Sequence, residues 1–313
     1  MTSPLPPPIA GTAIDPVAMG ATRVVPTLPL VAAMGAIAVL TASLLASKYL
    51  LDAVVGFGWP VVVYVALLAA VGYGPSLWWC WFASRRWGTG HLGTDIGLTP
   101  RWADLGWGPL VWLGAIAAQV AVGAVVIGLG LPFAGNTEGI DEIRADRTYV
   151  VSLVITAVIA APIVEEMVFR GVVMRGLRSR LPVVAAVLAQ GLLFGLAHVD
   201  PVRGSGNVGL VLVLAGVGVA FGVAAVLLGR IGPTIVAHAI FNGVVLVIVL
   251  TGVVDRLDDA SLQGAEQIGV VDEADIAEPR GDRNAGGTRS AAAFVELSEP
   301  AERGAVEDVD IVE

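Results

Sequence analysis

Seven apolar stretches constrain this chain more than any other feature of its sequence. A helix needs about 20 apolar residues to cross the hydrocarbon of a bilayer, and only helices and closed barrels satisfy their backbone groups there. We therefore expect an all-α, polytopic membrane bundle of about seven transmembrane helices, within a range of six to eight. The stretches lie near residues 28–47, 59–83, 109–134, 149–174, 182–199, 208–228 and 233–254.

The composition excludes an ordinary soluble domain. Hydrophobic residues make up 56% of the chain and charged residues 14%, with a mean hydropathy of +0.81, far from the usual balance of a globular protein. Two stretches leave the helix count open. Several glycines and prolines interrupt 53–83, which allows a re-entrant piece or a kinked helix, and 182–199 is short.

The two ends of the chain differ from the apolar middle. Residues 1–27 are rich in proline and lack a basic segment followed by an apolar one, so we expect a disordered leader and no cleaved signal peptide. Residues 255–313 hold 16 acids against 5 arginines and account for the net charge of −9, and we expect a disordered acidic tail. The transmembrane domain then spans 28–254.

Lysines and arginines in the connecting segments indicate the orientation. With a cytoplasmic N-terminus, eight of them lie on the cytoplasmic side and five outside, which fits the positive-inside rule. We expect a multi-pass protein of a bacterial plasma membrane with this orientation. Seven spans would place the acidic tail outside, and one miscounted span would bring it back to the cytoplasm.

Strongly polar side chains within the apolar stretches concentrate in the second half of the chain. An ionised carboxylate at the centre of a membrane helix costs about 2.5–3.5 kcal/mol, so such groups mark functional sites. The single cysteine, Cys80, excludes an intrachain disulfide and a cysteine metal cluster. The polar residues are Glu165, Glu166 and Arg170 in the fourth stretch, Gln190 and His198 in the fifth, and His238 and Asn242 in the seventh.

Helical spacing shows which of these groups can act together. His238 and Asn242 are four residues apart, so both point from one face of a helix. Glu166 and Arg170 have the same spacing, with the acid first, which suits an ion pair. Pro162 interrupts the helical hydrogen bonds just before the two glutamates and opens room beside them.

A glutamate, two histidines and an asparagine on three helices make a plausible hydrolytic centre. Glutamate and histidine can activate a water as general bases or hold a metal ion, and histidine with asparagine can donate to an oxyanion.

Three ordered motifs in 148–250 resemble the CPBP family of intramembrane proteases, also named the CAAX protease and bacteriocin-processing or Abi family, which includes type II CAAX prenyl endopeptidases. The EExxxR motif runs from Glu165 to Arg170, FxxxH from Phe194 to His198, and HxxxN from His238 to Asn242. Each motif is weak alone, but their order within apolar segments is specific. The first half of the chain shares only general hydrophobicity with the family.

The resemblance implies roles for these residues. Glu165 and His198 would activate the attacking water, and His238 and Asn242 would stabilise the oxyanion, with Glu166 and Arg170 in support. A zinc ion held by Glu165, His198 and His238 is one version of the chemistry, although the sequence has no HExxH motif. A metal-free glutamate mechanism is the other. The implied substrate is a hydrophobic, membrane-associated or lipidated peptide or protein, and we expect no nucleic-acid partner.

Other interpretations stay open for the same residues. Glu166 and Arg170 can form a purely structural ion pair, and buried histidine, asparagine or Gln190 can hold helices together by hydrogen bonds. For the whole protein, the alternatives are a non-catalytic immunity or scaffold protein and a proton-coupled transporter. We detect no inverted repeat of the kind that many transporters carry.

Helix lengths raise one geometric difficulty. With about 1.5 Å of rise per residue, Glu165 lies about 24 Å from the start of its stretch at Tyr149, and His198 about 24 Å from Pro182 at the opposite face. A shared site therefore requires the fourth stretch to begin in the headgroups, near Ser152, and the fifth to be strongly tilted or to start late, around a water-filled cavity open to one side. We expect Glu165, His198, His238 and Asn242 to converge within about 10 Å, because water activation needs groups near hydrogen-bond reach.

Overall fold

The described part of the chain, residues 28–135 and 147–252 of a computed structural model, is built from helices and short connections. Six of its helices are long and apolar enough to cross a membrane. The prediction of an all-α, polytopic membrane bundle is confirmed, and the protein is an integral membrane protein. The predicted leader at 1–27 and the predicted tail at 255–313 both lie outside the described residues.

All seven apolar stretches form helices, but one is shorter than a full span. Helix α8 has 14 residues, below the roughly 20 that crossing requires. The six longer helices are α1 with the turn that follows it (Leu30–Phe57), α2 (Val61–Trp87), α4 (Asp104–Gly128), the helix Arg147–Arg178, the segment Arg203–Leu228 that contains α9 (Asn207–Leu228), and α10 (Gly232–Thr251); α8 spans Val183–Leu196.

The region 53–83, whose glycines and prolines allowed a re-entrant piece, does not contain one. Helix α1 ends at Val54, a single 3₁₀ turn (Val55–Phe57) follows, and Gly58 at φ 63° reverses the chain. Helix α2 is then continuous through Pro75. A side chain at position 58 would be strained in this left-handed conformation, so glycine marks the turn between two spans.

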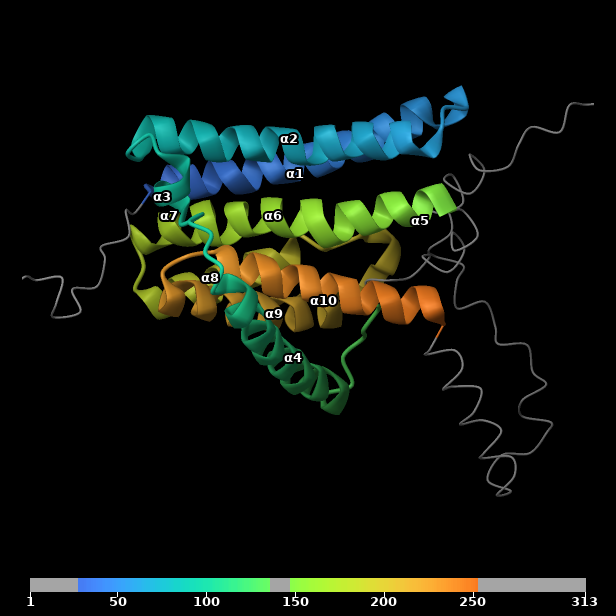
Figure 1. The fold of residues 1–313 in the computed structure, drawn as a ribbon. Helices are drawn as coiled ribbons and strands as arrows, with labels where there is room; N and C mark the ends of the chain where they lie inside the picture. The colour runs from blue at the N-terminus through green and yellow to red at the C-terminus, as the bar shows by residue number, and fades with distance from the viewer. Residues whose placement is uncertain (1–27, 136–146, 253–313) are drawn as a thin grey trace, which may run out of the picture.

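The helix Arg147–Arg178 lies at the centre of the bundle. It comprises α5 (Arg147–Val154), α6 (Ala161–Glu166) and α7 (Met174–Arg178), joined by two π-helical segments. Helices α1 and α2 pack along one side of it, and α8, α9 and α10 pack along the other, with α4 resting on α9 and α10 (Figure 1). The segment that carries both glutamates therefore lies between the first two helices and the helices of the second half of the chain.

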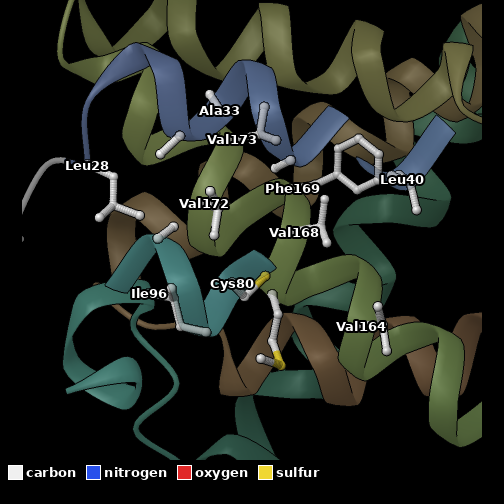
Figure 2. Close-up of a cluster of buried hydrophobic side chains, with 14 of the residues drawn as sticks. Leu28, Ala33, Leu40, Cys80, Ile96, Val164, Val168, Phe169, Val172 and Val173 are labelled. Atoms are coloured by element: carbon white, nitrogen blue, oxygen red, sulfur yellow. The ribbon is translucent and has the colours of Figure 1, made fainter. Parts of the chain in front are cut away.

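The main apolar core joins the central helix to the first two. Phe169 and Val173 face Ala33 and Leu40 of α1, and Cys80 of α2 belongs to the same cluster (Figure 2). Most of these side chains are fully buried. Because lipid is as apolar as these side chains, close packing rather than water exclusion holds such helices together. The core thus fixes the central helix against α1 and α2, and it extends to Phe194 of α8.

A short helix at one end of the bundle closes the connection between α2 and α4. This helix, α3 (Leu92–Ile96), buries the Asp95 carboxylate, which accepts hydrogen bonds from the hydroxyls of Ser84 at 2.6 Å and Thr89 at 2.7 Å and from the Gly90 amide at 3.2 Å. Burial raises the pKa of Asp95, but these hydrogen bonds outweigh burial and hold its pKa below the ordinary value.

An ion pair at the same end ties α4 to the turn before α10. The Arg230 guanidinium donates to Asp104 at 2.6 Å, and both side chains are largely buried. The Ile231 amide donates to the Gly97 carbonyl at 3.0 Å. A side chain at Gly232 would collide with the Asp104 carboxylate. No sequence spacing predicts this pair, because its partners are 126 residues apart.

Candidate active site

The two glutamates sit on a short α-helical segment between two π-helical ones. Helix α6 (Ala161–Glu166) follows a π-helix at Ile155–Ala160 and precedes another at Met167–Val173. Such wide turns are rare and occur frequently at functional sites, because they displace side chains and free backbone groups. The segment that carries Glu165 and Glu166 is therefore irregular on both sides.

Pro162 leaves one backbone carbonyl of the first π-helix, that of Ala157, without a helical donor. In the first π-helix the Ala161 amide donates to the Thr156 carbonyl, five residues back. The next bond of this kind would join residue 162 to the Ala157 carbonyl, but proline has no N–H. Asn242 of α10 takes its place, because its side-chain amide donates to the Ala157 carbonyl at 2.8 Å. The proline thus creates an acceptor that holds Asn242 against the central helix.

Glu166 and Arg170 form a completely buried ion pair. The Arg170 Nη1 donates to Glu166 Oε1 at 2.7 Å, and neither side chain has any exposure. A second guanidinium nitrogen, Nη2, donates to the Gly218 carbonyl of α9 at 3.1 Å. The ion pair inferred from the i, i+4 spacing is therefore present, and it also links the central helix to α9.

Two phenyl rings hold the arginine between them. The Arg170 guanidinium lies 4.5 Å from the ring centre of Phe194 and 5.2 Å from that of Phe221. A cation over an aromatic face is stabilised most where water is excluded. The same rings lie 5.8 and 5.5 Å from the His238 ring. Phe194 and Phe221 thus position both the arginine and the histidine.

His238 lies between the two glutamates. Its Nδ1 is 3.0 Å from Glu166 Oε1, and its Nε2 is 3.9 Å from Glu165 Oε2. A carboxylate only accepts hydrogen bonds, so Nδ1 carries the proton in that contact. Glu166 therefore fixes the orientation and proton position of the imidazole, and Nε2 faces Glu165.

Glu165 is less buried and less tightly held than its neighbour. Its side chain retains 18% exposure, whereas Glu166 has none. The Oε2 atoms of both glutamates lack a hydrogen-bond partner among the described residues, but Oε1 of Glu166 is held by Arg170 at 2.7 Å and by His238 at 3.0 Å. The shortest contact of Glu165 with an ionisable side chain is the one with His238 at 3.9 Å, so this carboxylate is less constrained.

His198 follows the end of α8 and lies against Phe194. Its Nδ1 is 2.8 Å from the Phe194 carbonyl, which can only accept, so Nδ1 donates and Nε2 is the acceptor in the neutral ring. The rings of Phe194 and His198 are 4.9 Å apart between centres. His198 thus offers a lone pair on Nε2, and it shares Phe194 as a neighbour with His238.

The depth difficulty disappears with the observed helix lengths. The central helix has 32 residues, about 48 Å, which exceeds the roughly 30 Å of hydrocarbon, so it extends into the headgroups as a shared site required. Glu165 lies about 20 Å from Arg178 along the helix, and His198 about 22 Å beyond Val183. Measured from the turn that joins α7 to α8, the two residues therefore lie at similar depth.

The sequence-predicted residues are assembled to different degrees. Glu165, Glu166, Arg170 and His238 form one contiguous group. His198 does not contact this group directly, but its ring packs against Phe194, which also packs against His238. Asn242 lies one turn beyond His238 on α10, and its amide binds the Ala157 carbonyl of the central helix. The sequence reading missed Phe221, whose apolar side chain gave no signal, and treated Gln190 only as a residue that holds helices together.

The zinc-binding alternative has no assembled ligand set in this part of the chain. Among the described residues, no group of three or more His, Cys, Asp or Glu side chains is arranged to hold a metal ion. The Nδ1 atoms of His238 and His198 are engaged by Glu166 and a backbone carbonyl, which leaves one nitrogen, Nε2, on each ring. The three ligands of a catalytic zinc site are thus not brought together among these residues.

Comparison with known families identifies one match. Residues 147–244 match the family model described as "Type II CAAX prenyl endopeptidase Rce1-like". The matched segment begins with the central helix and ends just after Asn242, so it includes all three motifs. Comparisons with curated proteins and with solved structures gave no match.

Proposed function

We propose that this protein is an intramembrane endopeptidase that hydrolyses a peptide bond within or beside the bilayer, because residues 147–244 match the model of Rce1-like type II CAAX prenyl endopeptidases. The observation that carries the proposal is the contact of Glu165 with His238, in which a half-shielded carboxylate faces an imidazole nitrogen at 3.9 Å. The proposed substrates are hydrophobic or lipidated peptides, which can reach a site between membrane helices.

Glu165 acts as the general base. Its carboxylate takes a proton from a water molecule, whose oxygen attacks the carbonyl carbon of the scissile bond. The unprotonated Nε2 of His198 accepts the second hydrogen of this water and orients it. The C–N bond then breaks, and Glu165 returns the proton to the leaving amine. The free oxygen of Glu165 and the proton position of His198 support these roles.

His238 and Asn242 stabilise the oxyanion that forms on the carbonyl oxygen. Because the His238 Nδ1 proton is directed to Glu166, Nε2 donates only when the ring is an imidazolium. Asn242 directs one amide hydrogen to the Ala157 carbonyl and has a second for the oxyanion.

Comparative peptide profiling tests the proposal. Membranes with the wild type, Glu165→Ala and His198→Ala are incubated with and without a chelator, and the released peptides are identified by mass spectrometry. We expect peptides that only the wild type releases, with and without chelator. Identical profiles for all three proteins would refute the peptidase and favour the scaffold alternative, and chelator-sensitive release would show a metal-dependent mechanism.

A further inference from the structure

Gln190 is a buried polar residue that the proposed chemistry does not use. It lies on α8 with no exposure. Its side-chain amide donates to the Gly218 carbonyl of α9 at 2.7 Å and to the Val187 carbonyl at 3.1 Å. An amide surrounded by apolar side chains is costly unless it is hydrogen-bonded. The short bond across to α9 therefore orients the amide.

The Gly218 carbonyl links this amide to the catalytic group. Arg170 donates to the same oxygen, and Arg170 in turn binds Glu166, which orients His238. Four helical segments are thus connected by one series of hydrogen bonds that starts at Gln190 and ends at the imidazole. Members of such networks polarise and position one another.

The face of α8 that carries Gln190 also carries Phe194, four residues further on. His198 follows just beyond the end of the helix. Helix α8 is short and begins at Val183, after Pro182. Its rotation against α9 therefore decides where Phe194 meets Arg170 and where His198 is presented.

Small residues on both helices permit this contact. A methyl group on Gly218 would press on the backbone of Gly191, and one on Gly222 would collide with the Gln190 amide nitrogen. Gly218 and Gly222, four residues apart, thus let α9 pack closely against the backbone and the Gln190 amide of α8.

From this connection we propose that Gln190 is a positioning residue of the active site. It holds α8 in register with α9 and, through the Gly218 carbonyl, fixes Arg170, Glu166 and the His238 ring. The effect of Gln190 on kcat rests on the proposed function, whereas its effect on the position of the His238 ring does not.

Three variants in reconstituted membranes separate positioning from folding. Gln190→Met keeps the shape and removes the donor, and kcat should fall about tenfold, the rate equivalent of one net hydrogen bond, with KM unchanged. Gln119→Met is the matched control on α4 and should keep wild-type kcat. Gln190→Glu donates to Gly218 only when protonated, so its kcat relative to wild type should fall as pH rises, whereas that of Gln190→Met should be independent of pH.

Nitrogen NMR of ¹⁵N-histidine gives a measurement that does not depend on turnover. The chain has three histidines, and His91, exposed on the connection before α3, is the internal reference. Gln190→Met should shift the ring nitrogens of His238 and leave those of His91 unchanged. Unshifted His238 signals, or wild-type kcat in an active preparation, would overturn the positioning role. An inactive wild type with shifted signals would instead refute the peptidase proposal alone.

Discussion

Neutralising either glutamate gives the sharpest contrast that the structure offers. Glu166→Gln keeps the volume and an acceptor oxygen, but it leaves the Arg170 guanidinium without a counter-charge at a site with no exposure. Breaking a buried pair from one side costs about 3–5 kcal/mol. Glu165→Gln removes a partly exposed carboxylate. Its contact with His238, at 3.9 Å, is longer than a hydrogen bond. Its effect on stability should be within about 1 kcal/mol.

Thermal unfolding and membrane yield of the two variants measure this difference. A loss of 3 kcal/mol lowers Tm by about 6 °C or more in a domain of this size, so Glu166→Gln should unfold earlier and accumulate less. Glu165→Gln should keep the Tm and yield of the wild type and lose the peptidase activity. Adding Arg170→Met to Glu166→Gln removes both charges and should recover part of the lost stability. Equal Tm values and equal activity losses in the two single variants would refute this division of roles.

The remaining predictions address the surroundings of the site. Asn242→Ala leaves the Ala157 carbonyl without its partner, so the free energy of unfolding should fall by about 1–3 kcal/mol, seen as a lower Tm. As the loss of an oxyanion donor, the same substitution should lower kcat about 100-fold. An unchanged kcat would exclude that role. Gly222→Leu should destabilise the protein, because its side chain would collide with Gln190, whereas a lipid-facing Leu227→Ala should not. The depressed pKa of Asp95 adds stability above the ordinary aspartate range, and this contribution should disappear as pH falls through the lowered value; Asp95→Asn should remove this dependence from pH-resolved unfolding curves.

Helix number and class follow from the sequence because lipid imposes a simple rule. Each apolar stretch long enough to cross must satisfy its backbone internally, and a helix does so. The exact bounds do not follow in the same way. Polar ends such as Asp104 and Arg147 extend helices beyond the apolar residues, and the two π-helical segments around α6 leave no compositional mark.

The site was predictable where spacing within one helix determines contact. The Glu166–Arg170 pair follows from i, i+4 geometry, and the motifs grouped Glu165 with His238. Contacts between helices were not predictable, since they depend on helix rotation and depth. The placement of Phe221 beside Arg170 is one example, and the bond from Asn242 to the carbonyl that Pro162 leaves free is another.

Solvent oxygen provides the most direct test of the central claim, that Glu165 activates water for peptide hydrolysis. The wild type and Glu165→Gln are incubated in H₂¹⁸O with a precursor of a peptide that profiling identifies as a product. The wild type should place one solvent oxygen in the new carboxyl terminus for each bond cleaved, and Glu165→Gln should form no product. Cleavage by Glu165→Gln at the wild-type rate, or a product without solvent oxygen, would contradict the account.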